Sequence, residues 1–323
     1  TGVFFLTISL LLALNGCSKP QLLLMPTPII YTDAAIDPFK HLQEDQKSTR
    51  TDIFYATNRT PNFTNNGLEY GNEFGSTIHL GTATVQMGFP DTTWADLYKD
   101  SLTGERVDSL PVIVENTLRD ASINVTDIHS DIVLTPEQIS YFEKINAALA
   151  QANDKEIMVY VHGTKVDFAN SAILTAEVDH FAGRDFVGIA FAWPSHQNIL
   201  HYLLGTDVKR AQDSSAPLKE LLYLLAKHTT ADQINILSYS AGGKVASKAL
   251  FELRQNYPDL SKKELKEKLR IGSAVFAAAD VEVDVFLERI TSISELADQV
   301  VLTISDSDNA LQAAKKFMGG NFR

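Results

Sequence analysis

The sequence predicts an α/β fold in which helices flank a mostly parallel sheet. From residue 156 onward, short apolar runs without polar alternation are separated by helical patterns. Strands buried on both faces have such continuous runs, and strand–helix alternation implies parallel strands joined by right-handed crossovers. The expected strands are 157–161, 186–193, 234–239, 271–279 and 300–305, and the expected helices are 169–181, 217–227, 243–255 and 283–296.

The part of the chain before residue 150 has a different pattern. Runs rich in β-branched and aromatic residues, punctuated by Gly and Asn, predict strands within residues 51–121, and residues 139–152 predict a helix. We therefore expect one domain over residues 51–323. Its first part, 51–150, supplies leading strands and a cover, and its second part, 151–323, supplies the core.

Residues 1–16 have the pattern of a signal peptide. The apolar run 3–14 is too short to span a bilayer, and it ends in Leu14-Asn15-Gly16-Cys17, which resembles a bacterial lipoprotein cleavage box. No basic residue precedes the run, so we expect the natural N-terminus to lie further upstream.

This pattern predicts a mature chain that begins at lipidated Cys17, with residues 17–50 as a tether. Acyl chains would then hold the protein in the cell envelope. Ser18 follows the cysteine in place of Asp, which favours the periplasmic face of the outer membrane. A plain secretory signal with an incidental cysteine is the alternative, and intact-mass analysis of the mature protein distinguishes the two.

Composition excludes several classes of function. A formal net charge of −12 without a basic stripe argues against a nucleic-acid partner. A single cysteine cannot form an internal disulfide. The chain contains no H-E-x-x-H, no cysteine cluster and no G-x-G-x-x-G, so we expect neither a metal nor a cofactor.

The segment "LSYSAGG" suggests a nucleophile on a strand-to-helix turn. Small residues, Ser238 and Gly242, lie two positions before and after Ser240, as a nucleophile elbow requires. The N-terminus of the next helix would favour a developing negative charge. The N–H of Ala241 is then one expected oxyanion donor, and the N–H of Thr164, after His162-Gly163, is the other. A tight turn made of small residues is the alternative interpretation.

Two carboxylates compete for the role of triad acid, and no histidine follows either of them. Asp308 comes after the expected strand 300–305, and Asp280 after the expected strand 271–279. Asp280 could instead cap the next helix. The order in such folds is nucleophile, acid, histidine, so we expect the final strand and the catalytic histidine beyond the last residue. His162 is expected to be structural, and His196 and His201 to border the pocket as less favoured bases.

These motifs resemble those of a bacterial α/β-hydrolase family of unknown function, described as esterase- or lipase-like. The resemblance spans Thr51 to Phe322 and rests on "FYATNR", "YVHG", "FAWPS", "LSYSAGG", "AAADVEVDVF" and "TISDSDNAL". It implies the α/β-hydrolase fold, with Ser240 as nucleophile and Asp308 as acid. Tyr239-Ser240-Ala241-Gly242 stands where the family typically has His-Ser-Met-Gly.

Two functions remain open at this point. The first is a lipid-anchored serine hydrolase that acts on a carboxylic ester, thioester or amide of a small molecule or lipid. The second is a non-catalytic envelope lipoprotein that uses the fold as a binding or scaffolding module. A histidine after a further strand in the full-length protein would favour the enzyme.

Overall fold

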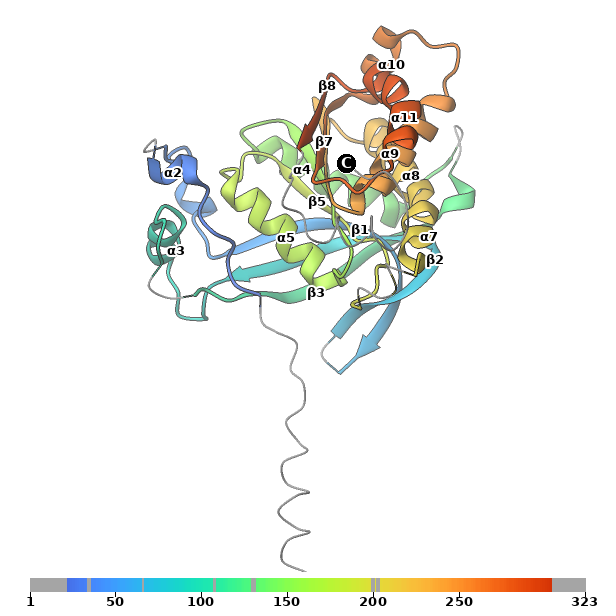
Figure 1. The fold of residues 1–323 in the computed structure, drawn as a ribbon. Coiled ribbons are helices and arrows are strands. Elements are labelled where there is room, and N and C mark those ends of the chain that lie inside the picture. The colour runs from blue at the N-terminus through green and yellow to red at the C-terminus, as the bar shows by residue number, and fades with distance from the viewer. Residues whose placement is uncertain are drawn as a thin grey trace, which may run out of the picture.

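In the computed structural model, one eight-stranded sheet organises the residues that are described, 22–303 without 34–35, 66, 107–108, 129–131, 199–200 and 202–203. The strand order is β3-β2-β1-β5-β4-β6-β7-β8 (Figure 1). Cys17, Asp306 and Asp308 lie outside the described residues, so the lipid anchor stays a prediction.

The five strands expected after residue 156 are confirmed as a parallel set. Each pairs in parallel with its neighbours, and burial on both faces explains the continuous apolar sequences of the inner strands, whereas β8 is a partly exposed edge strand. The strands are β4 (Glu156–Val161), β5 (Val187–Phe191), β6 (Gln233–Tyr239), β7 (Ile271–Ala277) and β8 (Gln299–Thr303).

Three leading strands extend the same sheet. β1 (Arg50–Thr64), β2 (Gly67–Met87) and β3 (Val112–Asn124) form an antiparallel meander. β1 also pairs in parallel with β5, where Phe54 lies opposite Ile189. The mostly parallel α/β sheet is thus confirmed, with β2 as its antiparallel strand.

Helices cover both faces of the sheet, and each face has its own apolar core. One face packs against α4 (Pro136–Gln151), α8 (Ser215–His228), α9 (Gly242–Gln255), α10 (Lys262–Leu269) and α11 (Val283–Leu296). The other face packs against α5 (Phe168–Phe181) and α3 (Trp94–Ser101), and Figure 1 shows α5 lying across the strands. The four helices expected in the core half are confirmed.

Short helices complete the described elements. α3 and α7 (Thr206–Asp213) were not expected from the sequence, because each has only eight residues and few of them are apolar. The remaining short helices are α2 (Ile29–Asp33), η1 (Glu44–Gln46) and η2 (Val125–Asp127).

The segment that enters the domain packs along its surface. Leu24 is buried, and its N–H donates to Leu110 O at 2.8 Å. The next N–H, that of Met25, donates to Glu177 Oε1 at 2.6 Å. Burial raises the pKa of Glu177, on α5, to about 7, although the Met25 N–H and Arg106 favour the ionised form. A carboxyl group on α5 therefore holds residues 22–27 against the domain.

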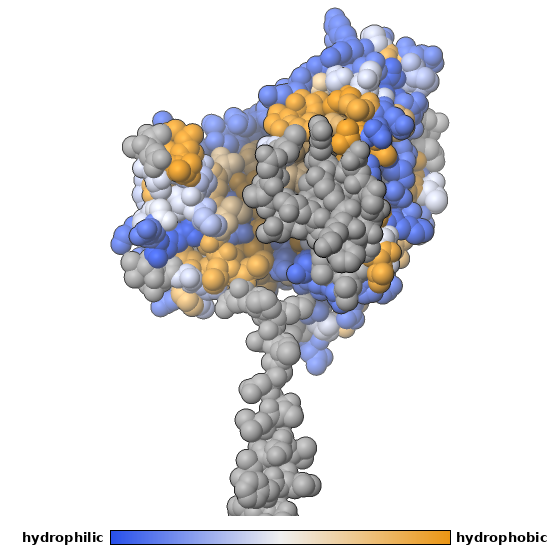
Figure 2. Space-filling view, viewed as in Figure 1, coloured by the Kyte–Doolittle hydropathy of each residue, from blue (hydrophilic) through white to orange (hydrophobic). Residues whose placement is uncertain are grey.

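An apolar area lies on the surface at the β8 edge. Figure 2 shows it beside β8 and α11, from which Leu302 and Leu287 are exposed. Within the described part of the chain, no helix is both long and apolar enough to cross a membrane.

We predict that Glu177→Gln stabilises the protein at alkaline pH. A carboxyl whose pKa is raised on folding adds stability below its unfolded pKa and loses that contribution as the pH rises through about 7. Glutamine keeps an oxygen for the Met25 N–H but carries no charge. The free energy of unfolding at pH 8 should rise by about 1–3 kcal/mol, and less at pH 5.

Chemical denaturation at both pH values measures this effect. The exposed Glu143→Gln, on α4, is the matched control and should change neither value appreciably. Equal changes at pH 5 and pH 8 in the Glu177 variant would contradict the proposed cause.

Candidate active site

Ser240 lies at the sharp turn between β6 and α9. Its φ is +50°, in the left-handed region that a residue with a side chain rarely adopts. The backbone is held on both sides: Ser240 N–H donates to Ala277 O at 3.0 Å, and Ser240 O accepts the N–H groups of Gly243 and Asp280 at 2.9 and 3.1 Å. The strain is therefore held by hydrogen bonds to the residues around β7 and α9.

The small residues around Ser240 allow the backbones of β4 and α9 to meet. A Cβ at Gly242 would lie 2.3 Å from Val161 O and 2.6 Å from His162 O. A Cβ at Gly163 would lie 3.1 Å from Ser240 Cβ. Ser238, which stands where glycine is usual, is buried and satisfies its hydroxyl by donating to Val275 O at 3.0 Å.

The two expected oxyanion donors lie on either side of this close approach. Ala241 directly follows Ser240 at the start of α9, and Thr164 directly follows Gly163. Neither N–H has a hydrogen-bond acceptor among the described residues. Two unused backbone donors beside a serine on a strained turn are what stabilisation of a tetrahedral oxyanion requires.

His162 lies in the loop after β4, where neighbouring groups hold its ring in place. It is fully buried, its Nδ1–H donates to Gly163 O at 2.7 Å, and its ring stacks on Trp193. Burial, together with the nearby charge of Arg59, lowers the pKa of His162 to about 3. Trp193 Nε1–H donates to His162 O at 2.7 Å, so the loops after β4 and β5 are fixed to each other.

Arg59, on β1, ties these same loops together. Its guanidinium is fully buried and donates to Trp193 O at 2.6 Å and to Val166 O at 2.7 Å. It also donates to Asn72 Oδ1 at 2.8 Å, on β2. Burial lowers the pKa of Arg59 to about 9, and the charges of Asp167 and Asp207 oppose that shift.

Asp280, one of the two candidate acids, lies beside the elbow. Its side chain is buried and its Oδ1 is 3.6 Å from the Nζ of Lys244, itself buried on α9. Burial lowers the pKa of Lys244, and Glu282, 3.2 Å away, opposes this. Asp280 does not cap α11, because Glu282 is the N-cap residue. Asp308 lies outside the described residues.

The described histidines contact groups other than the Ser240 hydroxyl. His196 Nδ1–H donates to Asp207 Oδ1 at 2.6 Å, and its ring stacks on His201. The others bond or pack against residues other than Ser240. Within the described part of the chain, no cluster of three or more His, Cys, Asp or Glu side chains could hold a metal ion.

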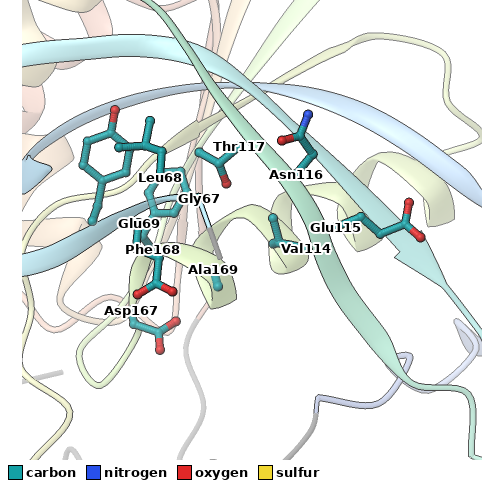
Figure 3. Close-up of a pocket in the computed structure, with 11 residues that line it drawn as sticks. Gly67, Leu68, Glu69, Val114, Glu115, Asn116, Thr117, Asp167, Phe168 and Ala169 are labelled. Carbon is teal, nitrogen blue, oxygen red and sulfur yellow. The ribbon is translucent and has the colours of Figure 1, made fainter. Parts of the chain in front are cut away.

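A separate cavity of about 290 Å³ lies between the β1–β2 hairpin, β3 and the start of α5. Figure 3 shows the carboxylates of Glu69 and Asp167 on one side of it and Glu115 on the other. Ser240, Ala241 and Thr164 do not line it. This cavity is therefore distinct from the candidate active site.

Sequence reasoning missed three charged residues near the elbow. Arg59 was part of a quoted motif but had no assigned role, and the buried positions of Asp207 and Lys244 were not expected. A signal existed only for Arg59, whose motif continues an expected strand. The partners of Asp207 are 11 and 43 residues away in the sequence, so no local pattern could reveal them.

The parallel sheet, the helices on both faces and the elbow after β6 define an α/β hydrolase. The chain belongs to the family described as alpha/beta hydrolase of unknown function (DUF900), whose model matches residues 137–323. This confirms the fold class and the resemblance to an α/β-hydrolase family.

Two solved structures share a distant likeness. A Trichoderma reesei cutinase in complex with a phosphonate inhibitor has 17% identity and a TM-score of 0.29, over 54% of this chain and 74% of the cutinase. A Pyrococcus horikoshii acylaminoacyl peptidase has 11% identity and a TM-score of 0.27, over 81% of this chain and 55% of the peptidase. None of the curated proteins matches this chain.

We predict that Gly242→Ala disrupts the elbow. A Cβ 2.3 Å from Val161 O forces β4 and α9 apart, which should cost about 2–3 kcal/mol of unfolding free energy. Displacement of the Ala241 N–H should also slow any reaction at Ser240.

Thermal melting and denaturant titration measure the loss. Gly71→Ala is the matched control, since a Cβ there meets no atom closer than 3.8 Å, and it should change stability by less than about 1 kcal/mol. Melting of Gly242→Ala at the wild-type temperature would show that the contact is relieved without cost.

Proposed function

We propose that the protein is a serine hydrolase that acts on a carboxylic ester, thioester or amide. The observation that carries this proposal is Ser240 at φ +50°, near two backbone N–H groups that have no acceptor among the described residues. A tight turn of small residues needs no unused donors on a neighbouring loop, whereas acyl transfer does. Membership of the α/β-hydrolase family agrees with this chemistry.

In the proposed reaction, Ser240 Oγ attacks the carbonyl carbon of the substrate. The hydroxyl proton passes to a histidine Nε2, and the N–H groups of Ala241 and Thr164 bind the oxyanion. The histidine then protonates the leaving alcohol, thiol or amine as its bond to the carbonyl carbon breaks. Water attacks the acyl-serine by the same route, which releases the carboxylic acid and restores the Ser240 hydroxyl.

We assign Asp308 to the orientation of that histidine. This assignment rests on its place after the strand that follows β7, the usual place of a triad acid, and on the family's motif. Asp280 is less suited, because its carboxylate faces the Lys244 ammonium. In this fold the histidine follows the acid along the chain.

We predict that the full-length protein reacts with a fluorophosphonate probe at Ser240. Ser240→Ala should abolish labelling and keep the circular dichroism spectrum, because alanine needs no more room than serine at the turn. Ser294→Ala, on α11, is the control and should label like the wild type. Labelling that survives Ser240→Ala, with the protein folded, would reject Ser240 as the nucleophile.

The two acids can be separated by kinetics. Asp308→Asn in the full-length protein should lower kcat for p-nitrophenyl butyrate by about 10⁴, with little change in melting temperature. Asp280→Asn should chiefly lower stability, because it removes the negative charge that faces buried Lys244. The opposite pattern, in which only Asp280→Asn lowers kcat, would make Asp280 the acid.

A further inference from the structure

Asp207 joins the expected oxyanion loop to the loop after β5. It lies in the first turn of α7 and is fully buried. Its Oδ2 accepts the Thr164 hydroxyl at 3.2 Å and the His196 N–H at 3.1 Å, and its Oδ1 accepts His196 Nδ1–H at 2.6 Å. Both carboxylate oxygens are therefore engaged by residues of two other loops.

The loop after β4 needs such a contact to hold its shape. Lys165, directly after Thr164, has a φ of +61°, a conformation that costs a lysine roughly 1 kcal/mol. Side-chain contacts hold the loop on both sides of this residue. Thr164 donates to Asp207, and the Ser195 hydroxyl donates to Val166 O at 2.8 Å.

The loop after β4 also sets the distance between the Thr164 N–H and Ser240. Gly163 lies against Ser240, so the chain can move little at that point. One residue later, the Thr164 hydroxyl is held by its hydrogen bond to Asp207. Asp207 also lies on α7, which packs against α9, the helix that begins after Ser240. The residues that carry both expected donors are thereby linked to the packed helices α7 and α9.

We propose that Asp207 is a positioning residue for the oxyanion hole, acting through the Thr164 hydroxyl to aim the Thr164 N–H at the substrate oxygen. This inference rests on the proposed serine-hydrolase function. A donor that acts only on the oxyanion stabilises the transition state more than the bound substrate. Loss of its position therefore lowers kcat and leaves KM nearly unchanged.

The test compares two variants of Thr164 in the full-length protein. Thr164→Val keeps the backbone N–H and the branched shape but removes the hydroxyl, and Thr164→Ser keeps the hydroxyl. With p-nitrophenyl butyrate as substrate, Thr164→Val should lower kcat about tenfold, with KM changed less than twofold. Thr164→Ser should recover at least half of the lost kcat.

Thr84→Val is the matched control. The Thr84 hydroxyl also donates to a carboxylate, Asp52 Oδ1 at 2.6 Å, but this pair lies at the start of β1, away from Ser240. Its loss should leave kcat and KM at wild-type values. A fall in kcat as large as that of Thr164→Val would show that such a hydrogen bond acts through general stability, and would overturn the inference.

A double-mutant cycle tests Asp207 itself. If Asp207 acts through Thr164, the variant Thr164→Val/Asp207→Asn should have nearly the kcat of Asp207→Asn alone. If the kcat losses of the two single variants multiply in the double variant, the inference is overturned. If Asp207→Asn fails to fold, the two Thr164 variants decide: equal kcat in Val and Ser, or a change confined to KM, contradicts the positioning role.

The fluorophosphonate probe keeps this result separate from the proposed function. Wild-type labelling at Ser240 combined with unaffected Thr164 variants rejects only the role of Asp207. Absence of labelling in the wild-type protein rejects the serine-hydrolase function and the positioning role with it.

Discussion

The carboxyl edge of the sheet depends on the buried guanidinium of Arg59. Its donors end on backbone oxygens of the loops after β4 and β5, Val166 and Trp193 among them, and on β2 through Asn72. Removing a guanidinium from water costs roughly several kcal/mol unless its N–H groups find hydrogen-bond acceptors. Here the backbone oxygens of the loops accept them. One buried guanidinium thus holds both loops, so the loops cannot vary independently.

This arrangement explains why the loop after β4 can serve Ser240. The elbow places a residue with a side chain at φ +50°, and Gly242 lets the backbone of β4 approach α9 closely. A loop that flexed would lose the alignment of its N–H with the serine. His162 stacked on Trp193, and Trp193 bonded back to His162 O, join the elbow region to the Arg59 contacts. The geometry at Ser240 is thus fixed mainly by residues of the neighbouring loops and by Arg59 on β1.

The sequence was sufficient for the parts of the site that depend on local order. Strands buried on both faces are continuous apolar runs, and the elbow requires small residues at fixed spacing around Ser240, so both were predicted from short segments. The burial of Lys244 was not predictable in this way. A lysine after a turn reads as an exposed residue, and only the fold brings Asp280, from the end of β7, to within 3.6 Å of it. Asp207 is similar, since its partners come from two other loops.

Buried charges around the elbow differ in what balances them, and this difference bears on function. Arg59 is balanced mostly by neutral carbonyl oxygens, Lys244 by the carboxylates of Asp280 and Glu282, and Asp207 by hydrogen bonds from Thr164 and His196. The Asp207 carboxylate therefore lies close to the loop that it contacts. A carboxylate would repel an oxyanion if it faced the substrate directly. Because both oxygens of Asp207 are engaged and buried, the loop gains a fixed shape. The N–H of Thr164, which follows Gly163 beside Ser240, remains available as a donor.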